Sequence, residues 1–412
     1  PDGFENPEAL NNETIIDKEG LLERVYSSES ENFLWNVSTR MEFDGYIAFS
    51  VKLEPKHPVE INDMSLEVPF NLEIATYMMG MGKRGGYRPG EWQWKWNIER
   101  ADNMVWLGNP DAGLQVKLMN LDEENHWQMD HLKKSGFPDF WYNEGKGGVR
   151  ISENTHNLKL QAYSGSRNLT AREKLQFRFR FLITPFKSID KQHWNWRVGD
   201  PGQEKGANIQ HIHHGNPLNP YINYPFITID TLAKSMNQVR SNVQKSRSHE
   251  GGINIYYTVR ELSNRVSEMW PLRSLGDEVL SSTGHPPGER ADFQEVDIYW
   301  DANVAENYPR GGHPWLQEHL VSGYVRRWND PLDNGEVDAS IPTTGLSRWH
   351  NYYIEGMKWL MDHTGIDGLY LDGIGYNREI MKRVAKVMYR SNGYYRINFH
   401  GGNTYDAPWG PG

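Results

Sequence analysis

The sequence contains no cysteine among its 412 residues. This absence excludes a disulfide framework, a thiolate metal site and a cysteine nucleophile. No apolar run approaches the roughly 20 residues that a membrane helix needs, so we expect no membrane span. A glycine-rich phosphate loop is also missing, because the first strand of the C-terminal half runs into His213-His214-Gly215-Asn216-Pro217. A nucleotide-binding sheet is therefore disfavoured.

Positive charge is scarce as well, with 44 Lys and Arg against 54 Asp and Glu and a net charge of −10. This balance repels nucleic acid, which we do not expect as a partner. Aromatic residues are abundant at 12%, including 16 Trp and 21 Tyr. Sugar rings stack on indole and phenol rings, so the surplus favours carbohydrate binding. Large rings also fill β-rich cores, and composition alone leaves both interpretations open.

The N-terminal part of the chain carries strand patterns without a convincing amphipathic helix. Residues 1–30 are polar and acidic, which is typical of an edge segment or linker. Residues 41–53 alternate between apolar and polar side chains over much of their length. Similar short runs, separated by clusters of Gly, Pro, Asn and Asp, continue to about residue 184. We therefore predict an antiparallel β-sandwich over residues 30–190.

From about residue 206 the pattern changes to alternating strands and helices. The predicted strands are 208–213, 252–259, 365–372 and 394–400, and the predicted helices are 228–243, most of 260–280, 347–364 and 378–390. Repeated βα units indicate a parallel sheet, and we predict a (β/α)8 TIM-type barrel over residues 206–412. Only about five strands fit, so we expect the barrel to be incomplete and the chain to be a segment of a longer protein.

Catalytic groups of such barrels lie at the C-terminal ends of the strands. Asp372 ends the apolar run 366–371 and precedes Gly373, which allows close approach to the backbone. A carboxylate there can attack an anomeric carbon or stabilise an oxocarbenium-like transition state. Asp367 lies before the strand interior and is expected to be a cap or a salt-bridge partner.

Glycoside hydrolysis usually needs a second carboxyl group that protonates the leaving oxygen. Glu318 is the best candidate, since Trp315 offers an aromatic wall and His319 a group that tunes its pKa. An exposed helical glutamate is the alternative for this position. Glu261 is the runner-up.

Other polar and ring-bearing residues also stand at strand ends, where turns alone would need only Gly or Asn. The predicted substrate-binding residues, besides Trp315 and His319, are His211, His213, His214, Tyr256, Arg260, Tyr370, Asn398 and His400. The histidines have no nearby carboxylate, so they favour hydrogen bonds to sugar hydroxyls or a buried structural role over zinc. Arg260 either binds an acidic group on a sugar or pairs with Glu261 or Asp277. We expect neither a metal nor a cofactor.

Three N-glycosylation sequons begin at Asn12, Asn36 and Asn168. They permit a secreted or extracellular location, which we expect. The sequence starts at Pro1 without a signal peptide, so we expect an N-terminal piece to have been removed or not observed. In the sandwich, Trp92, Trp94 and Trp96 share one face of a strand and are expected at the domain interface rather than in a sugar platform.

Four segments resemble glycoside-hydrolase-like proteins related to glycoside hydrolase family 123. They are Phe181-Leu182-Ile183-Thr184-Pro185-Phe186-Lys187, His213-His214-Gly215, Tyr256-Tyr257-Thr258-Val259-Arg260-Glu261-Leu262 and Gly365-Ile366-Asp367-Gly368-Leu369-Tyr370-Leu371-Asp372-Gly373. The resemblance spans most of residues 30–412. It implies a β-sandwich followed by a (β/α)8 barrel, and action on glycans.

The resemblance also implies a mechanism that this sequence does not match in full. Family 123 enzymes use an adjacent Asp–Glu pair at a barrel strand end and act on N-acetylhexosamines with help from the substrate's acetamido group. Here Gly373 follows Asp372, so neither the substrate-assisted mechanism nor N-acetylgalactosamine as substrate is carried over. The pair Asp277-Glu278 lies in a predicted helix and is not given this role.

Three functions are compatible with these features. The leading one is a glycosidase that acts on an extracellular glycan or polysaccharide through Asp372. The alternative is a non-catalytic carbohydrate-binding or structural glycoprotein that retains the fold. A metal-dependent hydrolase or lyase that uses the histidines is the third.

Overall fold

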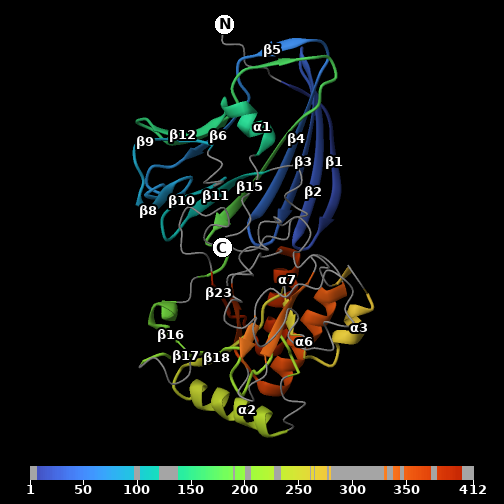
Figure 1. Ribbon diagram of the computed structural model, residues 1–412. Coiled ribbons are helices and arrows are strands. Elements are labelled where there is room, and N and C mark those ends of the chain that lie inside the picture. Colours follow the sequence, from blue (N-terminus) through green and yellow to red (C-terminus); the bar gives the residue numbers. More distant parts are fainter. Residues whose placement is uncertain are drawn as a thin grey trace. The chain divides into compact units, whose positions relative to one another are not determined.

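The computed structural model describes most of the chain, in two compact units (Figure 1). The described residues are 7–96, 103–119, 138–188, 191–199, 206–226, 233–259, 261–263, 265–275, 278–279, 329–331, 337–343, 348–372 and 378–400. The first unit comprises Pro1–Asn125, Lys134–Asp190 and Asn403–Pro411, and the second comprises His126–Lys133, Lys191–Gly402 and Gly412.

The first unit is built from antiparallel sheets. A nine-stranded sheet has the order β1-β2-β3-β4-β15-β11-β10-β7-β8, and a four-stranded sheet has the order β6-β13-β12-β9. The strands of the large sheet are β1 (Glu8–Lys18), β2 (Leu21–Glu29), β3 (Phe33–Glu42), β4 (Tyr46–Pro55), β7 (Tyr77–Gly80), β8 (Lys83–Tyr87), β10 (Met104–Gly108), β11 (Gly113–Met119) and β15 (Leu175–Thr184). Those of the small sheet are β6 (Ser65–Phe70), β9 (Glu91–Lys95), β12 (Gly148–Glu153) and β13 (Leu158–Tyr163). A two-stranded ribbon of β5 (Val59–Ile61) and β14 (Arg167–Leu169), the helix α1 (Asp139–Tyr142) and the 3-10 turn η2 (Asn143–Gly145) complete it.

One hydrophobic core joins the two larger sheets. Leu107 and Leu118 of the nine-stranded sheet and Ile151 and Leu160 of the four-stranded sheet are at most 2% exposed and belong to the same cluster. The inward residues recur at every second position of their strands, as the alternation in the sequence predicts. The fold of this unit is therefore a mostly antiparallel sandwich.

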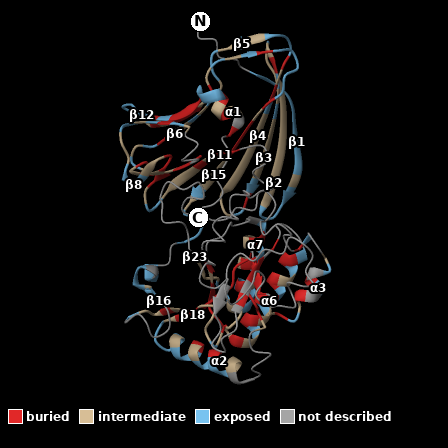
Figure 2. Cartoon of the chain, in the orientation of Figure 1, coloured by how far each residue is buried: buried red, intermediate tan, exposed pale blue. Residues whose placement is uncertain are grey.

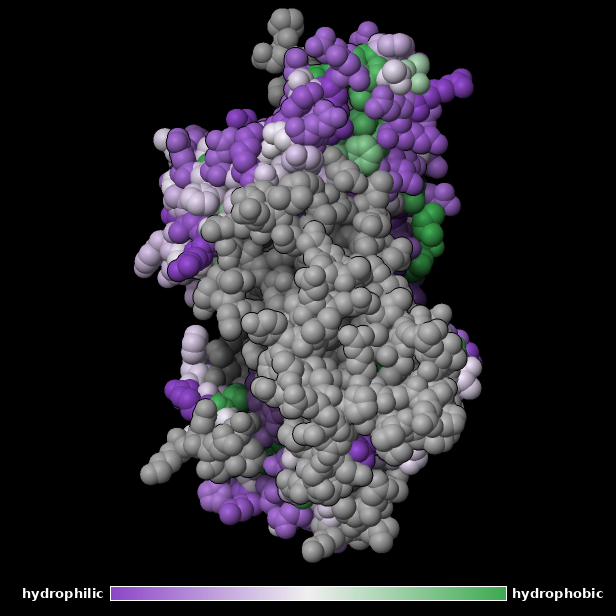
Figure 3. All heavy atoms as spheres, in the orientation of Figure 1, coloured by the Kyte–Doolittle hydropathy of each residue, from purple (hydrophilic) through white to green (hydrophobic). Residues whose placement is uncertain are grey.

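Two details of this unit bear on the sequence predictions. The hairpin β1–β2, which spans most of residues 1–30, forms one edge of the nine-stranded sheet, and β1 is exposed along nearly its whole length. Trp94 is buried in the sandwich core, and Trp92 and Trp96 pack against that core. Where Figure 3 colours this unit, the surface is mostly hydrophilic.

The second unit is centred on a parallel sheet. Its order is β16-β17-β18-β22-β23, with β16 (Val198–Gly199), β17 (Ile209–Ile212), β18 (Gly252–Tyr256), β22 (Gly368–Asp372) and β23 (Ile397–His400). The helices are α2 (Ala233–Arg247), α3 (Met269–Arg273), α6 (Arg348–Thr364) and α7 (Arg378–Asn392), with the 3-10 turn η3 (Lys191–Asn195). Five parallel strands with helices between them form a half-barrel sheet.

The helices cover one face of the parallel sheet, and that face is aliphatic. Ile212, Ile253, Ile255, Leu369 and Leu371 form a buried cluster with residues of α2, α6 and α7. Figure 2 shows the buried residues on α6 and α7. Among the described residues, no helix combines the length and apolar character that a membrane crossing requires.

The prediction that 260–280 is mostly helical is wrong. Glu261–Ser263 is strand β19 of a small antiparallel sheet with β21 (Val337–Pro342) and β20 (Asn329–Pro331), and helix α3 has only five residues. Ser340 donates to the Glu261 carboxylate at 2.8 Å, and Ser263 donates to the Asp338 carboxylate at 2.5 Å. Pairing with a strand almost 80 residues later in the chain overrides the local helical preference.

Candidate functional site

The C-terminal ends of three neighbouring strands bring several predicted residues together. Tyr256 of β18 pairs with Tyr370 of β22, and Tyr370 pairs with Asn398 of β23. Paired residues of adjacent parallel strands share a face, and here it is the face opposite the aliphatic cluster. Two residues further along β22 and β23, Asp372 pairs with His400, at the last residue of each strand. The backbone thus places Asp372 at the predicted position.

His211 of β17 crosses this face and contacts side chains two and three strands away. Its ring lies flat on Tyr370, with centroids 4.5 Å apart and planes 15° apart. Its Nε2 lies 3.0 Å from Nδ2 of Asn398. His211 is 6% exposed, whereas Tyr370 and Asn398 are half-buried. These contacts across non-adjacent strands show that the sheet is concave on this face.

Three further rings extend the cluster beyond the end of β17. The centroid of the His213 ring lies 4.6 Å from that of the Tyr256 ring and 5.8 Å from that of the Tyr370 ring. His214 lies edge-on to Tyr256 at 4.4 Å. Both histidines are half-buried and Tyr256 is buried. The structure therefore gathers six of the predicted substrate-binding residues, His211, His213, His214, Tyr256, Tyr370 and Asn398, into one cluster.

The sequence prediction missed two residues deeper on the same face. Asn254 is 1% exposed, and neither polar atom of its amide has a hydrogen-bond partner among the described residues. Arg396 lies across Gly368 and Gly252, and its guanidinium stacks on Trp196 at 4.7 Å. A polar residue between Ile253 and Ile255, inside an otherwise apolar strand, was the available signal for Asn254. No comparable signal marked Arg396, because its contacts depend on the curvature of the sheet.

Asp367 is confirmed as a salt-bridge partner. Its Oδ1 accepts a hydrogen bond from Arg247 Nε at 2.8 Å and another from the Tyr394 hydroxyl. Its Oδ2 accepts from the backbone N–H of Ile253 at 2.8 Å. Burial lowers the pKa of Arg247, but the hydrogen bonds and charge interactions with Asp367 and Tyr394 together outweigh it, and the pKa is raised above its ordinary value. This network stands at the N-terminal end of β22.

Several predicted site residues lie outside the described residues. These are Arg260, Trp315, Glu318 and His319, and the side chains of Asp372 and His400. The runner-up acid, Glu261, is 1% exposed and hydrogen-bonded within the small antiparallel sheet. Glu278 is paired with Arg348, whose Nε lies 2.6 Å from Oε1 of Glu278, and this hydrogen bond lowers the pKa of Glu278. Both glutamates thus have partners within the protein.

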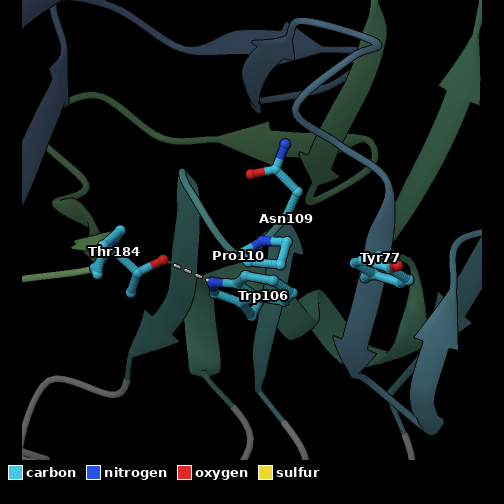
Figure 4. A pocket seen from close by; sticks show the side chains of 6 residues that line it. Tyr77, Trp106, Asn109, Pro110 and Thr184 are labelled. Carbon is cyan, nitrogen blue, oxygen red and sulfur yellow. Dashed lines mark hydrogen bonds between the residues drawn. The ribbon is translucent and has the colours of Figure 1, made fainter. Parts of the chain in front are cut away.

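A separate pocket of about 330 Å³ lies in the first unit (Figure 4). Tyr77, Trp106, Asn109, Pro110, Thr184 and Pro185 line it. The indole N–H of Trp106 donates to Thr184 Oγ1 at 2.8 Å, and Asn109 Oδ1 accepts from two backbone N–H groups of its own turn. These polar groups serve the local structure, so the pocket offers a ligand mainly apolar surface.

Within the part of the chain that the structure describes, no three His, Asp or Glu side chains are arranged so that they could hold a metal ion.

Similar proteins were found in solved structures, at low sequence identity. The putative aldose 1-epimerase from Escherichia coli K12 is 7% identical over 42% of this chain and 68% of that chain, with a TM-score of 0.26. A cycloisomaltooligosaccharide glucanotransferase from Paenibacillus sp. is 8% identical over 86% and 42% of the two chains, with a TM-score of 0.31. The alpha-galactosidase from Thermus thermophilus is 10% identical over 91% and 76%, with a TM-score of 0.25. No curated protein matches the sequence.

Family models give the decisive comparison. The model for the TIM-barrel domain of glycoside hydrolase 123 matches residues 187–410, and the model for the third domain of the same family matches residues 6–185. Together they cover both compact units, and the first alone covers more than half of the chain. The half-barrel sheet with its cluster of rings thus lies within a TIM-barrel domain, and the chain belongs to glycoside hydrolase family 123.

Proposed function

We propose that this protein hydrolyses glycosidic bonds at the C-terminal edge of its parallel sheet, with Asp372 as the essential carboxylate. The observation that carries the proposal is the contact of His211, Tyr370 and Asn398 at that edge. They come from three strands, and Asp372 ends the central one of these, β22. In TIM-barrel enzymes this edge carries the active site.

The chemistry of the cluster suits a sugar. Tyr370, His213 and His214 are half-buried rings, which offer flat faces for the C–H surfaces of a pyranose. Asn398 and the histidines carry polar atoms suited to hydroxyl groups. Asp372 lies two residues beyond Tyr370 on β22, in alternation register with the cluster. Its carboxylate would then act as nucleophile or base, and a second carboxyl group, for which Glu318 is our candidate, would protonate the leaving oxygen.

The test uses the full chain and a panel of aryl glycosides that covers neutral hexoses, N-acetylhexosamines and uronic acids. On any glycoside that is cleaved, Asp372→Asn is expected to lower kcat/KM by about 10²–10⁴-fold, the usual contribution of such a group. Asp362→Asn is the matched control, because Asp362 is exposed on α6 and its partners among the described residues are Lys358 and Ser391. Full activity of Asp372→Asn would refute the assignment. Glycan binding without any hydrolysis would favour the non-catalytic alternative.

We also propose an extracellular location with N-linked glycans on the sandwich unit. Asn12 of β1, Asn36 of β3 and Asn168 of β14 are all exposed, as a glycosylation acceptor must be. A shift in mass after treatment of the naturally produced protein with an N-glycosidase would support this. An unmodified chain at all three positions would contradict it.

A further inference from the structure

The hydrogen bond between His211 and Asn398 determines the protonation of a buried imidazole. Nδ2 of an asparagine only donates hydrogen bonds, so His211 Nε2, 3.0 Å away, accepts one. An accepting ring nitrogen carries a lone pair and no proton. His211 is then neutral, and its single ring proton lies on Nδ1.

The surroundings of His211 hold the ring in this position. It is 6% exposed and stacks on Tyr370 with an interplanar angle of 15°. Its strand, β17, and the strand of Asn398, β23, are separated by two other strands of the sheet. Asn398 therefore meets His211 only because the concave face brings the two side chains together. The Asn398 amide, which contacts the buried ring, is itself only half-buried.

We propose that Asn398 is a positioning residue that keeps His211 neutral and protonated on Nδ1. His211 then serves as a hydrogen-bond donor through Nδ1 and as neither a proton shuttle nor a metal ligand through Nε2, whose lone pair Asn398 occupies. This inference does not depend on the proposed function. The protonation state itself follows from the contact between the two side chains.

The assignment is tested by ¹⁵N NMR on the full chain, with histidine labelled at both ring nitrogens. The chain has 15 histidines, so the His211 signals are identified by their loss in His211→Gln. Wild type is expected to show Nε2 as the unprotonated nitrogen and Nδ1 as the protonated one. In Asn398→Asp, a carboxylate replaces the donor, and Nε2 of His211 is expected to become protonated.

The control variant is Asn392→Ala, which removes an amide that donates to the Ile366 carbonyl at 3.0 Å, outside the cluster. It is expected to leave the His211 signals unchanged. A protonated Nε2 in wild type would overturn the proposal, because Asn398 would then accept rather than donate. So would an unprotonated Nε2 in a folded Asn398→Asp protein. Neither reading needs hydrolysis, so the outcome is independent of whether the protein proves to be a glycosidase.

Discussion

The two ends of strand β22 have contrasting surroundings. Asp367, just before the strand, is 1% exposed and accepts hydrogen bonds from Arg247, Tyr394 and the backbone of Ile253. Asp372, the last residue of the strand, stands beyond the row that contains Tyr256, Tyr370 and Asn398. The N-terminal end of the strand thus adjoins an ion-pair network, whereas its C-terminal end adjoins a row of rings and an amide.

The difference shows how one strand separates stability from function. At the N-terminal end, Asp367 and Arg247 compensate each other's charge within the protein. At the C-terminal end, the described side chains are tyrosines, histidines and an asparagine, and most of them are half-buried. In parallel barrels, stabilising contacts commonly lie at the N-terminal ends of the strands and catalytic residues at the C-terminal ends. Variants at the two ends should therefore change different measured quantities.

The largest effect on stability is expected from Asp367→Asn. The substitution removes the charge that compensates Arg247 and replaces one acceptor oxygen by a donor beside groups that also donate. We expect the free energy of unfolding to fall by about 2–4 kcal/mol, measured by urea denaturation.

The control for this change is Asp362→Asn on α6. Its ion pair with Lys358 is exposed to solvent, so this variant is expected to leave the free energy of unfolding nearly unchanged. The contrast between the two ends fails if Asp367→Asn is no less stable than Asp362→Asn, or if the folded Asp367→Asn protein loses glycan hydrolysis as Asp372→Asn is expected to do.

A smaller loss is expected from Gly368→Ala, at the start of β22. A Cβ at this position would contact the Arg396 carbonyl oxygen and would lie 2.5 Å from Asn254 Oδ1. Backbone cannot move aside easily, so we expect a destabilisation of about 1–3 kcal/mol. Gly90→Ala is the control, since its Cβ would meet only Glu153 Oε2 at 3.7 Å. Equal melting temperatures of the two variants would show that the Arg396 backbone and the Asn254 side chain leave room for a Cβ at position 368.

The sequence predicted the elements around β22 because their signals are local. The apolar run before Asp372 and the amphipathic pattern of α6 each specify an element without reference to the rest of the chain. Strand β19 was missed because its register depends on β21, far along the chain. Likewise, the contact of His211 with Asn398 joins residues 187 positions apart through the curvature of the sheet. Sequence periodicity gives the face of a strand but not the curvature of a sheet.

Acidification should weaken the helix layer that lies behind both ends of the strand. His350 of α6 is 2% exposed, and burial, with a smaller contribution from Arg383, lowers its pKa to about 4. The unfolded chain, with an ordinary pKa near 6.5, binds a proton more readily than the folded one between these values. Stability is therefore complete above about pH 6.5 and falls as the pH drops towards 4, by up to about 1.4 kcal/mol per pH unit from this group.

Urea denaturation between pH 4 and pH 7 measures this slope. His350→Gln is expected to reduce it, whereas His249→Gln, at an exposed position after α2, is expected to leave it unchanged. If His350→Gln and wild type lose stability in parallel, another group causes the loss. The helix layer would then not be the acid-sensitive part of this unit.

The smallest effect is expected from Tyr394→Phe, which removes one donor from the network around Asp367. Asp367 keeps its ion pair with Arg247 and its bond to Ile253, and Tyr394 is 39% exposed. Water can therefore replace the lost hydroxyl, and we expect the free energy of unfolding to fall by about 1 kcal/mol or less. Combining Tyr394→Phe with Asp367→Asn tests whether the two residues act together, since the Tyr394 hydroxyl donates its hydrogen bond to the Asp367 carboxylate. The double variant should then lose less stability than the sum of the two single losses, and strict additivity would show that Tyr394 stabilises this end of the sheet by packing alone.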